Sequence, residues 1–235
     1  LETIMDGSQR TQGPAGAMLP AAYALAWFAL LRPTEYMLTP LHSSFDHTRH
    51  LRAGDITFWR GGTQLHDYEG GTPDRMLVNV KQSKTDWARL GARLVVGETG
   101  TRHCPVKYMW NYMRTTAPPP LGPLFPGLRY ATMLTVTRHF IGEDSELYGM
   151  HSFRVGGAQA MALAGRSPTY IMSRGRWKHI ESVCRYVEAP DDTKATDSEA
   201  MAKTKEQREH EATTGRGKRT HYQSEGERLL PRESG

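Results

Sequence analysis

The pattern of hydrophobic and polar residues begins with a loose segment and a buried helix. Residues 1–15 are polar and contain glycine, so we expect them to lack a fixed fold. The stretch Ala21–Leu31 is apolar nearly all round, which is typical of a helix buried on most faces. Pro33 then interrupts the apolar run, and in the stretch LRPTEY it stands at a first-turn position, so a new helix is expected there.

A run of short strands follows the first helices. Apolar, β-branched segments of strand length predict strands at DITFWR (55–60), RMLVNVK (75–81) and ARLVVG (92–97). Paired glycines at 61–62 and 70–71 mark turns before the second strand. The polar stretch QSKTDWARLG separates the last two strands, so we expect a small antiparallel sheet with a lysine-bearing turn.

Helical patterns fill the rest of the folded part. Helices are predicted at 105–115, 132–141, 151–164, 167–175 and 180–187. The fourth has Ser167 as N-cap, Pro168 in its first turn and Gly175 as C-cap. The fifth shows the i, i+3, i+4, i+7 spacing of an amphipathic helix. The predicted fold class is therefore α+β and mainly α-helical, with a flexible segment over 1–16, one domain over 17–190 and a polar, disordered tail over 191–235.

Composition places the basic character in the predicted domain. The 235 residues carry a net charge of +5, whereas residues 191–235 hold 9 Lys/Arg and 10 Asp/Glu, so the rest carries +6. This excess favours an anionic partner. The apolar part of the first helix, Ala17–Leu31, is interrupted by Pro20 and is shorter than the ~20 residues of a membrane span, so no membrane is expected. Cys104 and Cys184 fit reduced thiols inside a cell, and the histidines lack metal-site spacing, so neither metal nor cofactor is expected.

Several polar residues are unremarkable one at a time. His151 and Arg154 share a helix face at i and i+3, which is common in ordinary helices. Arg32 and Glu35 fit a local ion pair, and Lys84 fits a surface lysine. Tyr186 lies about 110° from the apolar centre of the last predicted helix, so it does not point into that helix's own core.

Taken together, these side chains suit phosphodiester transesterification without a metal. Arginine forks bind two phosphate oxygens at once and stabilise the charge of a pentacoordinate transition state. A tyrosine, with a pKa near 10, is a nucleophile that needs cationic neighbours or a base. A lysine can protonate the departing 5′-oxygen.

The same residues resemble the catalytic domain of the tyrosine recombinase (phage-integrase, Cre-like) family over about residues 17–190. LLRPTEY resembles its first box, with Arg32 as the first catalytic arginine and Glu35 as its acidic companion. KQSKTD resembles the β-turn whose lysine falls on Lys84, with Lys81 close by. The stretches HSFRVGGAQAMALAG and GRWKHIESVCRYV resemble the closing boxes, and they supply His151, Arg154, Trp177 and Tyr186. The intervals of 3, 23 and 9 residues between these four suit the family without a gap.

The resemblance implies a mechanism and partners. Tyr186 would attack duplex DNA to form a 3′-phosphotyrosyl link, with His151 as base and Lys84 as general acid. Arg32, Arg154 and the Trp177 indole would hold the phosphate, while Glu35 would orient the cluster. Five further cations fit DNA contacts and plain surface charge equally well: Arg49, Arg52, Arg174, Arg176 and Lys178.

The family also implies an assembly. Members act as tetramers on DNA and carry a separate N-terminal core-binding domain that this sequence lacks, and the 42–74 loop is longer than usual. The sequence LLRPTEY resembles that of recombinases of eukaryotic mobile elements (Crypton- or DIRS-like). Such an origin would place the protein in the nucleus; otherwise the cytoplasmic nucleoid is expected. The alternatives are a type IB topoisomerase, a domesticated DNA-binding module without catalysis, and a generic helical binding protein with a chance match.

Overall fold

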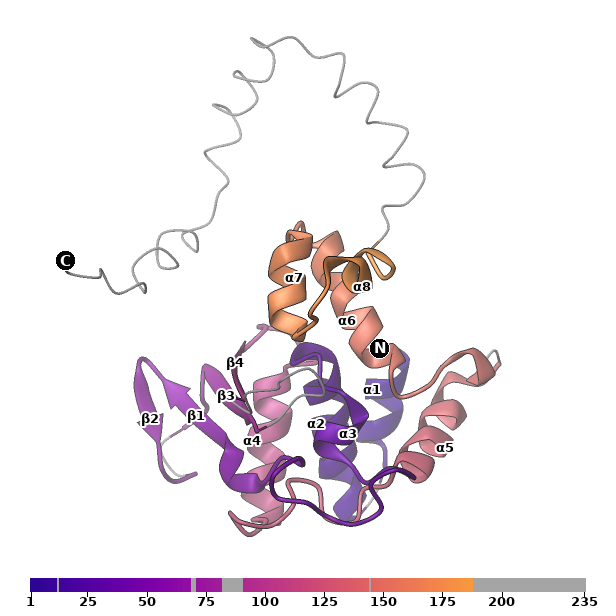
Figure 1. Ribbon diagram of the computed structural model, residues 1–235. Coiled ribbons are helices and arrows are strands. Elements are labelled where there is room, and N and C mark those ends of the chain that lie inside the picture. Colours follow the sequence, from indigo (N-terminus) through magenta and orange to yellow (C-terminus); the bar gives the residue numbers. More distant parts are fainter. Residues whose placement is uncertain (12, 69–70, 82–90, 144, 188–235) are drawn as a thin grey trace, which may run out of the picture. The chain divides into compact units, whose positions relative to one another are not determined.

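The computed structural model describes residues 1–11, 13–68, 71–81, 91–143 and 145–187. They form one compact unit of mixed α/β structure (Figure 1). The elements in chain order are α1 (Glu2–Gln9), α2 (Pro14–Phe28), α3 (Pro33–Tyr36), the 3-10 helix η1 (Ala53–Asp55), β1 (Ile56–Arg60), β2 (Thr63–Leu65), β3 (Arg75–Val80), β4 (Ala92–Gly97), α4 (Pro105–Thr116), α5 (Tyr130–Ile141), η2 (Ser145–Leu147), α6 (Ser152–Leu163), α7 (Pro168–Gly175) and α8 (Ile180–Cys184).

Helix α2 is the centre of the fold. Every residue from Ala21 to Ala26 is fully buried, because α1, α4 and α6 pack around it. The Tyr23 hydroxyl lies 2.9 Å from the Thr137 hydroxyl of α5, and its ring stacks on Phe153 of α6 at 5.2 Å between centroids. The prediction of a helix buried on most faces is confirmed, although the helix starts earlier, at Pro14, and ends at Phe28 rather than Leu31.

The prediction of a loose N-terminal segment is wrong for most of residues 1–16. Residues Glu2–Gln9 form α1, which packs against α2 and α5 through buried Ile4 and Met5. Gly7 lets the helix lie directly on the ring of Phe140, since a Cβ there would come within 2.5 Å of that ring. The apolar positions of α1 are few, so the sequence pattern alone does not reveal the helix.

The sheet is small and antiparallel, in the order β2-β1-β3-β4. The three predicted strands are confirmed within one residue at each end, and β4 has the predicted bounds. Strand β2 was not predicted, because three residues (TQL) are too few to show an alternating pattern. The sheet meets α4 where Phe58 packs edge-on against Trp110, with 5.0 Å between ring centroids.

The C-terminal helices differ from their predictions at their ends. Helix α7 is capped by Ser167, whose hydroxyl accepts from the Tyr170 amide at 3.2 Å, as predicted. Its left-handed C-cap is Arg176 rather than Gly175, which lies inside the helix. Helix α8 ends at Cys184 instead of continuing to 187. The amides of Tyr186 and Val187 still bond to the Val183 carbonyl, so the chain makes one further turn.

Helices α6, α7 and α8 gather at one end of the molecule (Figure 1). They share a small cluster of buried residues, Ala158, Ile171 and Val183. Helix α6 joins this group to the rest because it also packs on α2. At that contact a Cβ on Gly157 would lie 2.5 Å from the Trp27 carbonyl oxygen, so the absence of a side chain sets the spacing of the two helices.

We predict that Gly157→Ala lowers the free energy of unfolding by about 1–3 kcal/mol, because the new methyl group forces α6 away from the α2 backbone. Chemical denaturation measures the change. Gly97→Ala is the matched control, since a Cβ there meets nothing within 4 Å and should alter stability by less than about 0.5 kcal/mol. Equal stability of the two variants would contradict the close α2–α6 contact.

Candidate functional site

Three segments distant in sequence meet at the C-terminal end of α2. The first is the connection from α2 to α3, which carries Arg32 and Glu35. The second is the start of α6, with His151 at its N-cap and Arg154 in its first turn. The third runs from the end of α7 past α8 and carries Arg176, Trp177 and Tyr186. Contacts among these residues, described below, join the three segments into one site.

The chain leaves α2 through a Schellman motif. The Leu31 amide bonds to the Ala26 carbonyl at 3.2 Å, and the Leu30 amide to the Trp27 carbonyl at 3.4 Å. Leu30 occupies the left-handed position of this motif, at φ 49°, where glycine is usual. The turn redirects the backbone so that Arg32 N-caps the next helix, α3.

Arginines bind the carbonyl groups at the end of α2 and in the turn that follows it. Arg174 donates to the Phe28 carbonyl at 3.1 Å, and Arg176 donates to the next two carbonyls at 3.4 and 3.3 Å. Arg154 also donates to the Leu30 carbonyl. The last carbonyls of a helix have no partner within the helix and form the negative end of its dipole, so guanidinium groups are favourable there.

Arg154 is the most deeply placed cation of the site. Its side chain is fully buried; Nη1 bonds to the Leu30 carbonyl and Nη2 to the Gly175 carbonyl. Its guanidinium carbon lies 4.0 Å from the centroid of the Trp177 ring, a cation–π contact. Burial, and then the charges of neighbouring arginines, lowers the pKa of Arg154 to about 9, so it stays protonated at neutral pH.

Glu35 is the buried carboxylate that holds two arginines. Its Oε1 lies 3.2 Å from Nη1 of Arg32, and its Oε2 lies 2.7 Å from Nη2 of Arg176. The same Oε2 accepts the backbone amide of Arg32 at 2.8 Å, which caps α3. Arg32 keeps 16% of its side chain exposed, whereas Arg176 keeps 8% and Glu35 keeps 2%. Arg32 is therefore the arginine of this pair that a ligand can reach.

His151, Trp177 and Tyr186 lie around the buried arginine. The Tyr186 ring centroid is 6.3 Å from that of His151 and 6.1 Å from that of Trp177. Tyr186 is half-buried in the turn that follows α8. Partial burial and the positive charges of Arg154 and Arg32 lower the pKa of His151 below its usual 6.5, so its imidazole is neutral at neutral pH.

Glycine makes room for the indole. Gly175 precedes the Arg176–Trp177 pair, and a Cβ on it would lie 1.6 Å from the Trp177 ring. The ring therefore folds back against the end of α7 and covers Arg154. The Gly175 carbonyl, which accepts from Arg154, belongs to the same compact turn.

The lysine expected in the site is not among the residues that the structure describes. Lys84 falls within residues 82–90, which the structure does not describe. Lys81, its neighbour at the end of β3, forms an ion pair with Asp55 at 2.6 Å. Asp55, which the sequence analysis did not single out, also accepts from the side chain of Arg52 at 3.4 Å and from its amide at 2.9 Å.

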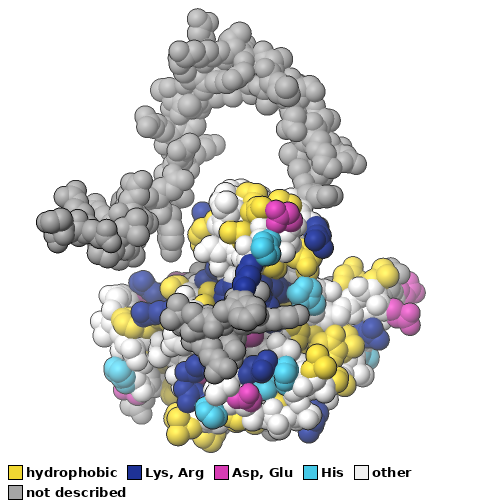
Figure 2. All heavy atoms as spheres, viewed as in Figure 1, with side chains coloured by type: hydrophobic (Ala, Val, Ile, Leu, Met, Phe, Trp, Pro, Cys, Tyr) yellow, Lys and Arg dark blue, Asp and Glu magenta, His cyan; other side chains and the backbone are white. Residues whose placement is uncertain are grey.

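The five additional cations do not form one surface. Arg174 and Arg176 donate to carbonyls of residues 28–30, so the expectation that they contact DNA needs correction; at Arg176 the left-handed C-cap of α7 turns the side chain into the protein. Lys178 is exposed, Arg49 is 38% exposed beside Asp46, and Arg52 is 25% exposed beside Asp55. Figure 2 shows Lys and Arg side chains gathered around the middle of the face it displays.

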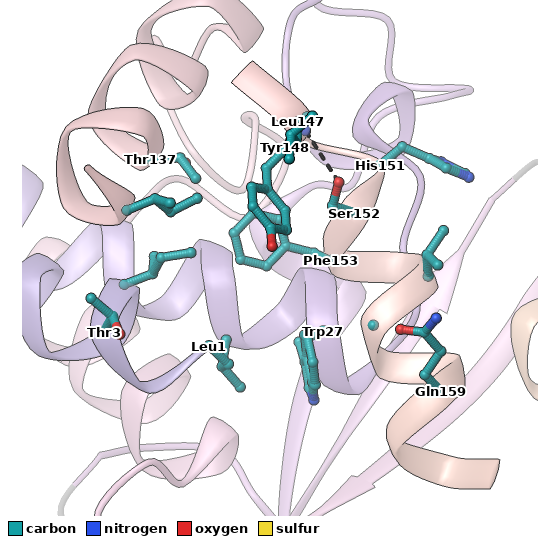
Figure 3. Close-up of a pocket in the computed structure, with 15 residues that line it drawn as sticks. Leu1, Thr3, Trp27, Thr137, Leu147, Tyr148, His151, Ser152, Phe153 and Gln159 are labelled. Atoms are coloured by element: carbon teal, nitrogen blue, oxygen red, sulfur yellow. Dashed lines mark hydrogen bonds between the residues drawn. The ribbon is translucent and has the colours of Figure 1, made fainter. Parts of the chain in front are cut away.

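A pocket of about 650 Å³ lies next to the site, between α1, α2, α5 and α6 (Figure 3). Most of its lining is apolar and includes Leu1, Trp27 and Phe153. His151 lies at its edge, with the ring directed away from the other labelled side chains in Figure 3. Because the remaining catalytic candidates do not line it, the pocket is a separate feature.

Comparisons with known proteins leave the family undetermined. No protein-family model matches the chain, and no curated protein matches it. Within the described residues, no helix is long and apolar enough to cross a membrane. Over those same residues, no three His, Cys, Asp or Glu side chains lie together as a metal site would require.

We predict that the imidazole of His151 titrates below pH 6.5, because burial and two nearby guanidinium groups oppose its protonation. An NMR titration of the histidine ring signals measures this, with His151→Gln to assign the signal. Arg32→Ala should raise the midpoint, since it removes one of the opposing charges. A midpoint at or above 6.5, or one that Arg32→Ala leaves in place, would contradict the described site.

Proposed function

We propose that the chain is the catalytic domain of a tyrosine recombinase, which cuts and rejoins duplex DNA through a 3′-phosphotyrosyl intermediate. One observation carries the proposal: Arg32, Glu35, His151, Trp177 and Tyr186 come from segments up to 154 residues apart and lie around buried Arg154. A chance sequence match gives no reason for such convergence. The mixed α/β fold, with a small antiparallel sheet beside a helical body, agrees with the proposal.

The charge of the site supports an anionic ligand. Three guanidinium groups, those of Arg32, Arg154 and Arg176, lie near one carboxylate, that of Glu35. Carbonyl dipoles offset part of the excess positive charge. A phosphodiester would offset more, and its charge grows as the transition state forms, so the site would bind that state more strongly than the ground state.

In the proposed cleavage, the phenolic oxygen of Tyr186 attacks the phosphorus of the scissile phosphodiester. The new P–O bond to tyrosine forms as the bond to the 5′-oxygen breaks. The phenolic proton passes to a base, for which His151 is the candidate, because its imidazole is neutral at neutral pH and its ring lies 6.3 Å from that of Tyr186. The departing 5′-oxygen takes a proton from a general acid, for which Lys84 is the candidate. A 5′-hydroxyl of another strand reverses these steps and rejoins the DNA.

The two box arginines have different tasks in this scheme. Arg32 retains exposed side-chain surface, so it meets the phosphate first. Arg154 is fully buried, so a phosphate oxygen reaches its remaining N–H donors only when the residues that cover it move aside. Until then it contributes positive charge from behind Trp177, whose indole N–H is a further donor.

Membership of the tyrosine recombinase family would also imply partners. Double-stranded DNA is the proposed substrate, a homo-tetramer the proposed assembly, and an N-terminal core-binding domain the proposed companion in the full-length protein. Arg49, Arg52 and Lys178 remain candidates for phosphate contacts outside the site. If the protein derives from a eukaryotic mobile element, it acts in the nucleus.

We predict that Tyr186 becomes covalently attached to DNA. The probe is a pool of nicked duplexes with a randomised sequence, in which cleavage of a phosphodiester close to the nick releases the short strand between them and traps the adduct. Denaturing gels should show a protein–DNA species, and mass spectrometry should place it on Tyr186. Tyr186→Phe should lower adduct formation by about 100-fold or more, because the nucleophile is missing.

Tyr170→Phe is the matched control, since Tyr170 is 53% exposed on α7 and lies outside the site. An adduct that survives in Tyr186→Phe, or none in the unmodified chain, would overturn the catalytic proposal. The second of these outcomes, with DNA binding retained, is what a domesticated DNA-binding module predicts. Relaxation of supercoiled plasmid without sequence preference would instead identify a type IB topoisomerase.

A further inference from the structure

Arg176 lies at a left-handed backbone position where an arginine side chain is unexpected. It is the C-cap of α7, with φ 60° and ψ 41°, a left-handed conformation that favours glycine. Glycine immediately precedes it, yet the left-handed position itself is an arginine. Because the backbone alone would favour glycine, we expect the arginine side chain to make contacts that offset the strain.

Those contacts lead away from the surface and into the site. The Arg176 side chain is 8% exposed, and its Nη2 lies 2.7 Å from Oε2 of Glu35. Nη1 and Nη2 also donate to the Ala29 and Leu30 carbonyls at 3.4 and 3.3 Å. A buried guanidinium held by a carboxylate and two carbonyls is not available to a DNA phosphate.

The same residue touches Arg32 by two routes. Through its side chain it holds Oε2 of Glu35, so that Oε1 is the carboxylate oxygen that Arg32 Nη1 meets at 3.2 Å. Through its backbone, the Arg176 carbonyl accepts Nη2 of Arg32 at 3.3 Å. Arg32 is therefore held at both terminal nitrogens by groups that Arg176 supplies or orients.

We infer that Arg176 is a positioning residue: it fixes the direction of the Arg32 guanidinium through Glu35 and its own carbonyl, and it does not bind DNA. The consequence for catalysis rests on the proposed function. Since Arg32 is the arginine that meets the phosphate, a small rotation of its guanidinium lowers the rate of cleavage, while the affinity for DNA depends on other contacts.

The experiment separates cleavage rate from DNA affinity. The substrate is the nicked duplex recovered from the randomised pool, and the protein is the full 235-residue chain. Single-turnover cleavage is measured at saturating duplex, and the dissociation constant is measured by fluorescence anisotropy. Arg176→Gln should lower the cleavage rate by about 10-fold or more while the dissociation constant changes by less than about 3-fold. The opposite pattern, weaker binding with an unchanged saturating rate, would make Arg176 a DNA contact and overturn the inference.

Two controls exclude a general loss of structure. Arg174→Gln removes a half-buried arginine of α7 that donates to the Phe28 carbonyl but does not touch Glu35, so its cleavage rate should stay within about 3-fold. Arg176→Gly suits the left-handed backbone and keeps the carbonyl that Arg32 uses, so it should fold and still cleave slowly. If it cleaves at the unmodified rate, the side chain has no positioning role.

A double-mutant cycle tests whether the effect passes through Glu35. Adding Arg176→Gln to Glu35→Gln should slow cleavage no further than about 3-fold beyond Glu35→Gln alone, because both changes break the same ion pair. Effects that multiply would show that Arg176 acts independently of Glu35.

The positioning role of Arg176 can also be tested in a protein that shows no catalysis. If the unmodified chain forms no adduct, the proposed function fails, and the guanidinium NMR signals of Arg32 decide the positioning claim. They should broaden or shift in Arg176→Gln and stay in place in Arg174→Gln. Signals of Arg32 that remain unchanged in Arg176→Gln would overturn the claim.

Discussion

The bonds between arginine side chains and the open carbonyl end of α2 organise the rest of the site. Arg154 from α6 and Arg176 from α7 both donate to the Leu30 carbonyl, in the turn that follows α2. These bonds attach the group of α6, α7 and α8 to the segment that carries Arg32. Removing a partner from such buried groups leaves a charge or a carbonyl without compensation, which is costly. The site and the packing of the C-terminal helices therefore depend on the same interactions.

The excess of positive charge is the feature that connects structure with chemistry. Glu35 is shared by Arg32 and Arg176, so one carboxylate serves two guanidinium groups, whereas the partners of Arg154 among the described residues are carbonyls and an aromatic ring. Neutral dipoles solvate such a charge but do not cancel it. An anion entering beside Arg32 finds a site whose donors are already oriented, which is the arrangement expected of electrostatic catalysis.

Much of the element order could be predicted from the sequence, because it depends on local pattern. The apolar run of α2, the strands β1, β3 and β4, and the Ser-Pro start of α7 all carry their signals within a few residues. Helix α1 and strand β2 could not be predicted, since α1 has few apolar positions and is stabilised by packing on α2, and β2 is too short to show a period. The apolar spacing of α8 continues to Val187, whereas the helix ends at Cys184 and one further turn follows.

The residues of the site likewise include some that the sequence predicts and some whose direction it does not reveal. The boxes around His151, Arg154, Trp177 and Tyr186 can be proposed from spacing, and the structure brings these residues near Arg32. The sequence does not show which way an arginine points, so Arg174 and Arg176 were expected at the surface and lie inside. The direction of Arg176 follows from its left-handed backbone, and that conformation has no signature in the letters SRGRW. Lys84 lies outside the described residues, so its place in the site remains a prediction.

The most direct test of the central claim is the polarity of the break, measured without divalent metal. Adduct formation is carried out with the recovered duplex in EDTA, and the released strand is offered to polynucleotide kinase. A cage of guanidinium groups around a tyrosine nucleophile predicts that cleavage proceeds in EDTA and that the released strand carries a 5′-hydroxyl, which the kinase labels directly. Loss of cleavage in EDTA, or a released strand with a 5′-phosphate, would contradict the account.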